Sequence, residues 1–357
     1  MRQCGVVYDT GRSLGSLSMN WRPDYTEPLM RRELDIIRTV LHANAVRLGG
    51  RDPRRLLAAA DYAASIGLDV WLGPELWNAT PRRTLSYVTS AAVAAEALFR
   101  RWPDRLTFCV GNELTLFMRG IVPGRTLAQR SRLPRLRPVV RSGQGTLRAF
   151  LGDVARSVRR VYGGPVSYSA QPFERVDWEL FDVVGVNYYR QQARSTEEYL
   201  ATIGQFRDTG KPVAVTELGF AACRDGDDPK LLSTFNAAPL SMLGMALPVV
   251  RRFVRPRVRT VHPRDEQAQA GRLVDQLQLL GEAGVERAFV MSFSFPLAPY
   301  SEDPGRDIDA TALSIVRSLP RGQRGTTYPG VGWEPKEAFH AVARYYRQQE
   351  AGRDTQL

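Results

Sequence analysis

Cysteine and histidine are scarce in this 357-residue chain, with three of each. The cysteines are odd in number, lie far apart and form no CxxC pair, so they indicate neither a disulfide framework nor a zinc site: Cys4, Cys109 and Cys223. The histidines show no metal-ligand spacing and are interpreted as structural or exposed: His42, His262 and His340. We therefore expect no metal ion, and we expect Cys109 to be part of the core.

Long hydrophobic runs and an N-terminal targeting segment are also lacking. The longest apolar run, 237–250, is too short to span a bilayer and is interrupted by Pro239, Gly244 and Pro248. The N-terminus enters an apparent strand at Gly5, which leaves no room for a signal peptide. The sequence predicts no transmembrane segment and a cytoplasmic protein.

Lysine is rare, and nearly all of the positive charge comes from arginine. The formal net charge is +12, and of 49 basic residues only Lys211, Lys230 and Lys336 are lysines. A basic protein can bind nucleic acid, but no helix-turn-helix spacing, ribonucleoprotein motif or zinc finger accompanies the charge. We expect no nucleic-acid partner, and the sequence does not indicate the oligomeric state.

Short apolar segments alternate with segments of helical periodicity along the chain. Eight segments are predicted strands: 5–8, 44–49, 68–73, 106–113, 165–170, 182–189, 212–217 and 287–295. This alternation predicts a parallel sheet. The length and the 43% hydrophobic content fit two ordinary domains or one barrel, and we favour an α/β fold in which residues 1–357 form a single (β/α)8 TIM barrel.

Two long insertions interrupt the alternation, after the fourth and seventh strands. The first, about 118–145, is rich in arginine and has no acid; the second, about 221–262, is apolar in its middle and basic at its end. Both follow strands at the carboxyl end of the barrel, so we expect them to overhang a pocket. Such lids would suit an anionic substrate or one with a bulky aglycone, whereas the alternative is a solvated or partner-binding face.

Two predicted strands end in a glutamate. The fourth strand runs into Glu113 and the seventh into Glu217. Active sites of (β/α)8 barrels lie at the carboxyl ends of the strands, where two carboxyl groups can act as acid/base and nucleophile on a glycoside. Either glutamate alone could instead cap a helix or lie in a solvated loop.

The pattern resembles that of the clan A glycoside hydrolases, the 4/7 superfamily of (β/α)8 barrels. The resemblance covers nearly the whole chain and rests on four segments: Gly111-Asn112-Glu113, Thr216-Glu217-Leu218-Gly219, Asn187-Tyr188-Tyr189 and Arg47. It implies a retaining mechanism with Glu217 as nucleophile and Glu113 as acid/base, their carboxyls about 5–5.5 Å apart.

The same resemblance implies roles for neighbouring side chains. Asn112 would bind the sugar hydroxyl next to the anomeric carbon, and Arg47 would keep Glu217 ionised. Strand alternation places Asn187 and Tyr189 on one face of the sixth strand, and Tyr189 would donate a hydrogen bond to Glu217. The alternatives are a turn-capping amide for Asn112, a surface position for Arg47 and a packing role for the tyrosine.

Some positions depart from the family pattern. The tryptophan that usually ends the eighth strand is lacking, so Phe293 or Phe295 must supply a sugar platform if any residue does. The third strand and the loop after it carry aromatic and acidic residues where many relatives have histidine: Trp71, Glu75 and Trp77. Stacking aromatics still fit a sugar ring, but these departures leave the substrate class open.

The sequence as a whole indicates a retaining O-glycoside hydrolase that acts on a small-molecule or oligosaccharide glycoside without metal or organic cofactor. Two alternatives remain open. One is a barrel that binds a sugar or partner without hydrolysis, because fold does not fix function. The other is a transglycosidase that uses the same residues. The sugar, linkage and aglycone are not indicated.

Overall fold

Eight parallel strands close into a barrel in the computed structural model, which describes residues 1–14, 19–131, 137–233, 236–246 and 253–354. The strands of the barrel are β1 (Gln3–Gly11), β4 (Ala45–Gly50), β5 (Asp69–Pro74), β6 (Leu106–Asn112), β7 (Val166–Ala170), β8 (Val183–Asn187), β9 (Val213–Leu218) and β10 (Arg287–Val290). Neighbours in this order pair in parallel, and β1 pairs with both β4 and β10, which closes the sheet. The predicted (β/α)8 fold class is confirmed.

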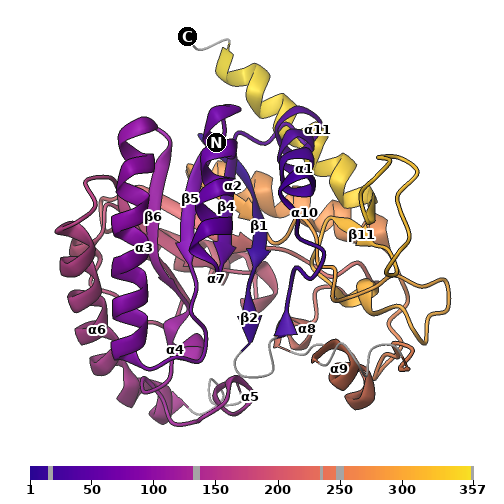
Figure 1. Ribbon diagram of the computed structural model, residues 1–357, viewed down its shortest axis with the longest axis horizontal. Helices are drawn as coiled ribbons and strands as arrows, with labels where there is room; N and C mark the ends of the chain where they lie inside the picture. The colour runs from indigo at the N-terminus through magenta and orange to yellow at the C-terminus, as the bar shows by residue number, and fades with distance from the viewer. Residues whose placement is uncertain (15–18, 132–136, 234–235, 247–252, 355–357) are drawn as a thin grey trace.

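Helices follow the strands and surround the barrel (Figure 1). The outer elements are α1 (Glu27–Thr39), α2 (Pro53–Ser65), α3 (Pro81–Arg101), α6 (Arg137–Arg159), the 3-10 turn η3 (Trp178–Leu180), α7 (Thr196–Arg207), α10 (Glu266–Glu282) and α11 (Glu337–Asp354). The outer element between β7 and β8 is the single turn η3. None of the helices in the described parts of the chain is long and apolar enough to cross a membrane.

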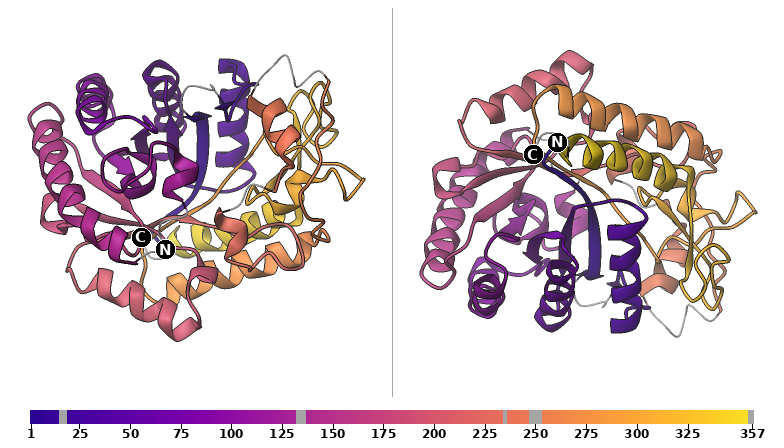
Figure 2. Two further views of the ribbon diagram at one scale, coloured as in Figure 1. Left: turned by 90° about the horizontal axis from the view of Figure 1, so that it is seen from below. Right: turned by 90° about the horizontal axis from the view of Figure 1, so that it is seen from above.

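The remaining elements are short and lie in the loops. They are β2 (Ser13–Leu14), β3 (Met19–Asn20), α4 (Leu114–Phe117), α5 (Leu127–Arg130), η4 (Arg190–Gln192), α8 (Lys230–Ser233), α9 (Pro239–Ala246), η6 (Ile308–Thr311), β11 (Val316–Ser318) and β12 (Trp333–Pro335). In Figure 1, β1 runs toward the lower edge, where α4, α5, α8 and α9 lie. That edge is the carboxyl end of the barrel, and the left view of Figure 2 looks at it.

Caps and prolines fix where several helices begin. The Asp52 side chain accepts a hydrogen bond from the Arg54 backbone N–H at 2.9 Å, and Pro53 occupies the first position of α2. Proline is favoured there because that N–H has no intrahelical partner and the fixed φ suits a helix. The Ser195 hydroxyl caps α7 in the same way by accepting from the Glu198 N–H.

The barrel interior is filled by side chains from several strands. One buried cluster lies inside the sheet: Val7, Ala45, Trp71, Val183, Ala214 and Phe289. The Phe289 ring fits only because β1 has a glycine opposite it, since a Cβ on Gly5 would lie 2.4 Å from the ring. A larger cluster packs the outer face of the sheet against the helices. The interior is therefore a packed core and not a channel.

Some of the boundaries predicted from the sequence are wrong. The strand β10 ends at Val290, so Phe293 and Phe295 lie beyond it. The first insertion ends earlier than predicted, because α6 begins at Arg137 and accommodates the glycines at 143 and 145.

Candidate active site

Glu113 and Glu217 are brought to the same end of the barrel by their strands. Glu113 directly follows β6, and Glu217 is the fifth residue of the six-residue strand β9. Asn187, the last residue of β8, is the register partner of Glu217. Both carboxyl groups are largely withdrawn from solvent, with 7% and 6% of their residue surfaces exposed. Their ionisation is therefore governed by protein neighbours.

Glu217 is surrounded by donors, one of them charged. The Arg47 guanidinium donates to its Oε1 at 2.6 Å, and the Tyr189 hydroxyl donates to Oε2 at 2.8 Å. The Asn112 amide lies at the limit of a hydrogen bond, 3.5 Å from Oε1. An ion pair and a phenol hydrogen bond both favour a charged carboxylate. The surroundings of Glu217 therefore stabilise its anion.

A second ion pair leaves Arg47 available for Glu217. Arg12 binds both carboxylate oxygens of Glu75, at 2.7 and 2.9 Å, whereas Arg47 is 3.8 Å from Glu75. Burial lowers the pKa of Arg47, but the charges of Glu217 and Glu75 outweigh it and raise the pKa above its ordinary value. Arg47 therefore carries a permanent charge. A Cβ on Gly49 would lie 2.3 Å from the Arg12 guanidinium, so glycine is required where Arg12 passes β4.

Glu113 has only neutral donors around it. The Gln171 amide donates to Oε2 at 2.5 Å, and the Asn187 amide donates to Oε1 at 2.7 Å. Burial raises the pKa of Glu113, and the negative charge of Glu217 raises it further, to about 8 against an ordinary value of 4.5. At neutral pH this carboxyl therefore holds a proton. Glu113 thus lacks the charged partner that Glu217 has in Arg47.

The backbone aims Glu113 at its neighbours. Glu113 adopts a left-handed conformation with φ 45° and ψ 51°, which costs about 1–3 kcal/mol for a residue other than glycine. The turn after it is fixed from outside, because the Leu114 N–H donates to the Tyr168 hydroxyl at 2.8 Å and the Thr115 N–H donates to Glu174 at 2.9 Å. These contacts hold the strained turn in place.

Asn187 connects the two glutamate-bearing strands. Its amide nitrogen donates to the Asn112 side-chain oxygen at 2.8 Å as well as to Glu113. Its own oxygen accepts from the Thr216 hydroxyl at 2.7 Å, which fixes the orientation of the amide. Tyr188 points the other way and stacks on Tyr199 with ring centroids 4.5 Å apart. The alternation expected for this strand is therefore present.

A cluster of four aromatic rings lies on loops at the carboxyl end. Trp77 stacks on Phe117 with centroids 4.3 Å apart, and Trp21 packs edge-on against both Trp77 and Phe295 at 5.0 Å. Trp21, Phe117 and Phe295 are partly exposed. The Trp77 indole N–H is buried and has no hydrogen-bond partner within the described residues. We call Trp21, Trp77, Phe117 and Phe295 the aromatic cluster.

Two predicted substrate-binding aromatics lie elsewhere. Trp71 points into the barrel but at a deeper level, where it is fully buried and its indole donates to Gln3 at 3.0 Å. Phe293 is fully buried outside the barrel, with its ring 5.2 Å from that of Trp333. Glu75 lies beside Arg47, with both oxygens held by Arg12. Trp71 and Phe293 therefore cannot contact a sugar in this structure.

Sequence reasoning misses three residues of the site. Gln171 directly follows β7 and binds Glu113; Arg12 follows β1 and binds Glu75. Both are polar residues just beyond the carboxyl end of a strand, which is the signal that identifies Glu113. Trp21 directly follows β3, in the segment that leads to α1. Only its contact with Trp77 and Phe295 in the structure identifies Trp21 as part of the site.

The arginines of the first insertion do not act as one group. Arg130 is fully buried and binds the Leu116 and Gly124 carbonyls at 2.6 and 3.0 Å. Arg141 belongs to α6, whereas Arg125 is exposed. In the second insertion the exposed arginines described are Arg224, Arg255, Arg257 and Arg259. Four further arginines of the two insertions lie outside the described residues: Arg132, Arg135, Arg251 and Arg252.

The fold and the paired acids define a (β/α)8 barrel with carboxyl groups at the ends of its fourth and seventh strands. Neither the protein-family models nor the curated proteins searched contain a match to the sequence. Among solved structures, the chain is similar to a GH113 β-1,4-mannanase with 14% identity and a TM-score of 0.54, covering 97% of this chain and 98% of that one.

Two further solved structures have the same fold. A GH113 β-mannanase from Alicyclobacillus acidocaldarius in complex with ManMIm matches with 15% identity and a TM-score of 0.52, over 97% of each chain. A β-glucuronidase from Bacteroides uniformis matches with 15% identity and a TM-score of 0.56, over 97% of this chain but 35% of that one, so the chain spans about a third of that enzyme. At these identities the likeness establishes the fold, which is the fold that the sequence resemblance implies.

Proposed function

We propose that this protein is a retaining O-glycoside hydrolase in which Glu217 is the nucleophile and Glu113 the general acid/base. The observation that carries the proposal is the contrast between the two carboxyl groups. Glu217 is paired with a cation and a phenol, whereas Glu113 is bound by neutral amides and has a pKa raised to about 8. A nucleophile must be charged and a general acid protonated before the first step.

In the first step, a Glu217 oxygen attacks the anomeric carbon. The bond from that carbon to the leaving oxygen breaks, its electron pair stays on the leaving oxygen, and Glu113 gives that oxygen its proton. The product is a glycosyl ester of Glu217. Forming the ester removes the negative charge of Glu217, so the pKa of Glu113 falls and the residue becomes a base.

In the second step, the Glu113 carboxylate takes a proton from water. The water oxygen attacks the anomeric carbon, the ester bond breaks, and its electron pair returns to Glu217 as a carboxylate. Asn112 and Asn187 supply amide groups beside the two carboxyls. Asn112 would bind the hydroxyl next to the anomeric carbon, where a hydrogen bond strengthens as positive charge develops.

The aromatic cluster suggests where the rest of the substrate binds. Flat apolar faces with a polar edge suit the faces of sugar rings, and the rings of Trp21, Phe117 and Phe295 are partly exposed. The helix α9 contacts β3, next to Trp21. We propose that the second insertion borders the aglycone side of the site, where the exposed Arg255 and Arg257 would favour an anionic group.

A panel of chromogenic glycosides tests the proposal. It should include β-mannosides and β-glucuronides, because the structurally similar proteins are named for these activities. For any substrate that is turned over, NMR of the first-formed product should show the anomeric configuration of the substrate. An inverted product would contradict the assignment of Glu217 as nucleophile.

The same panel separates the alternatives. Binding of sugars without turnover of any glycoside would indicate a barrel that only binds its ligand. Products in which the sugar is transferred to an added acceptor, in preference to water, would indicate a transglycosidase. Hydrolysis with retention at equal rates with and without an acceptor is the result we expect.

A further inference from the structure

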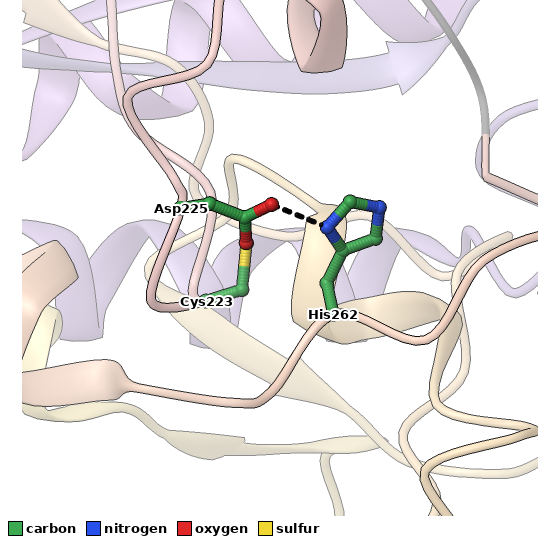
Figure 3. A group of neighbouring side chains, drawn as sticks. All are labelled: Cys223, Asp225 and His262. Atoms are coloured by element: carbon green, nitrogen blue, oxygen red, sulfur yellow. Dashed lines mark hydrogen bonds and ion pairs between the residues drawn. The ribbon is translucent and has the colours of Figure 1, made fainter.

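Cys223, Asp225 and His262 lie together at the two ends of the second insertion (Figure 3). The cysteine and the aspartate follow β9, whereas the histidine shortly precedes α10. Their ligand atoms all lie within 4.8 Å of one another. In Figure 3 the Asp225 carboxylate lies between the other two side chains, with one oxygen near the Cys223 sulfur and the other 2.7 Å from the His262 Nδ1.

From this arrangement we propose that Cys223, Asp225 and His262 form a zinc site that links the start of the insertion to its end. The inference is independent of the glycosidase proposal, because none of the three residues contacts Glu113 or Glu217 in the described structure. It reverses the expectation from sequence, where the wide spacing of these residues indicates no metal site.

The donor set fits zinc better than the common alkaline-earth ions. Thiolate, imidazole and carboxylate are the ligands that structural and catalytic zinc sites use, whereas Ca²⁺ and Mg²⁺ prefer sites made of oxygen. When the thiol proton is released to solvent, Cys223 and Asp225 together carry two negative charges, which balance a divalent cation. A fourth position would be filled by water.

The spacing also fits. Ligand bonds of about 2.0–2.3 Å in a tetrahedron place neighbouring ligand atoms roughly 3.3–3.7 Å apart. The present separations, from 2.7 Å for the Asp225–His262 pair up to 4.8 Å for the group, bracket that value. Small side-chain rotations therefore suffice, without movement of the backbone.

The backbone that carries the three ligands is already fixed. The Asp265 N–H donates to the Ala222 carbonyl and the Arg224 N–H donates to the Pro263 carbonyl, both at 2.9 Å. A turn between Cys223 and Gly226 is closed by a 3.0 Å hydrogen bond. These bonds hold the two ends of the insertion side by side, so a metal ion would not have to bring them together.

Access and local charge allow a cation to enter. The Cys223 side chain is buried, whereas those of His262 and Asp225 are 15% and 48% exposed, so the ion would enter past the carboxylate. Arg272 is a positive charge close to the site. Its guanidinium binds the Cys223 and Arg224 carbonyls and pairs with Asp227 at 3.3 Å. Asp227 thereby offsets its effect.

The experiment uses the whole protein with Zn²⁺ and Co²⁺ as probes. We expect one equivalent of Zn²⁺ to remain bound after dialysis and to raise the midpoint of thermal unfolding. Co²⁺ should produce a thiolate charge-transfer band. Cys223→Ser should remove this band, and His262→Ala should weaken Zn²⁺ binding by roughly 100-fold or more, beyond the 10–100-fold loss typical for residues that only support a ligand.

The matched control is His42→Ala. His42 also pairs with a carboxylate, with its Nδ1 3.2 Å from Glu350, but that pair is not part of the cysteine-containing group. Circular dichroism would verify that each variant is folded, and Asp225→Asn provides a third substitution if one is not. No thiolate band in the wild type, a band that survives in Cys223→Ser, or equal Zn²⁺ loss in His42→Ala and His262→Ala would overturn the proposal.

Discussion

Glu113 and Glu217 occupy equivalent places at the ends of two strands, yet their neighbours differ in charge. Glu217 faces the Arg47 guanidinium and the Tyr189 hydroxyl, whereas Glu113 faces the side-chain amides of Gln171 and Asn187. A buried carboxyl without a cation favours its neutral form, and one beside a cation favours its anion. In the proposed mechanism, the surroundings and not the residue type would assign the roles of nucleophile and acid/base.

Replacement of Glu217, the proposed nucleophile, should lower turnover more than any other substitution. Glu217→Gly should lower turnover by roughly 10⁴-fold or more, because no other group can form the covalent intermediate. The rate of glycoside hydrolysis and the unfolding midpoint should be measured together, with the exposed Glu302→Gly as the control variant. A residual rate within tenfold of the wild type would show that Glu217 is not the nucleophile.

Replacement of Glu113, the proposed acid/base, should lower the rates of different substrates by unequal amounts. Glu113→Ala should lower the rate by roughly 10²–10⁴-fold for poor leaving groups, which need the proton, and should spare aryl glycosides with good leaving groups in the first step. Added azide should restore part of the rate by replacing water in the second step. An equal loss across leaving groups would contradict an acid role.

The pH dependence of kcat/KM in the wild type should reflect the proton on Glu113. Because Glu113 loses its proton as the pH rises through about 8, kcat/KM should fall above that pH. This fall at high pH should disappear in Glu113→Ala when the substrate has a good leaving group. A fall that persists in the variant would belong to another residue.

Replacement of Tyr189, which binds Glu217, should have a smaller effect on kcat/KM. Tyr189→Phe removes one hydrogen bond to Glu217 and should lower kcat/KM by roughly 10–100-fold, the value of a hydrogen bond to a charged group. Tyr188→Phe is the matched control, because its ring stacks on Tyr199 on the opposite face of the chain. Similar losses in both variants would indicate a general packing effect.

Much of the fold could be predicted because each element has a local signal. Strand and helix periods, and the caps at Asp52 and Ser195, place the elements within a few residues. The acids are found because a polar residue at the end of an apolar strand is conspicuous, whereas Arg47, which lies within β4, is found only through the family resemblance. Applied to Gln171 and Arg12, the same signal would have extended the predicted site.

Local sequence patterns do not specify how deep in the barrel a side chain lies, or on which side of the sheet it lies once the strand has ended. Alternation correctly turns Trp71 inward, but it does not say that Trp71 lies below the site, in the packed interior with Phe289. Phe293 is turned outward only because the chain leaves the sheet after Val290. The aromatic cluster joins four separate loops, and the Cys223–His262 pairing spans an insertion. Such contacts depend on how the loops return to the barrel, which no local pattern specifies.

The central claim is that Glu217 and burial together keep Glu113 protonated, and it can be tested without knowing the substrate. The measurement is the titration of the Glu113 carboxyl by carbon-13 NMR, assigned by its loss in Glu113→Gln, in the wild type and in Glu217→Gln. We predict a wild-type midpoint near pH 8 that falls in Glu217→Gln but stays above 4.5, because burial is the larger cause. A wild-type midpoint near 4.5, or one that does not move when Glu217 loses its charge, would contradict the account.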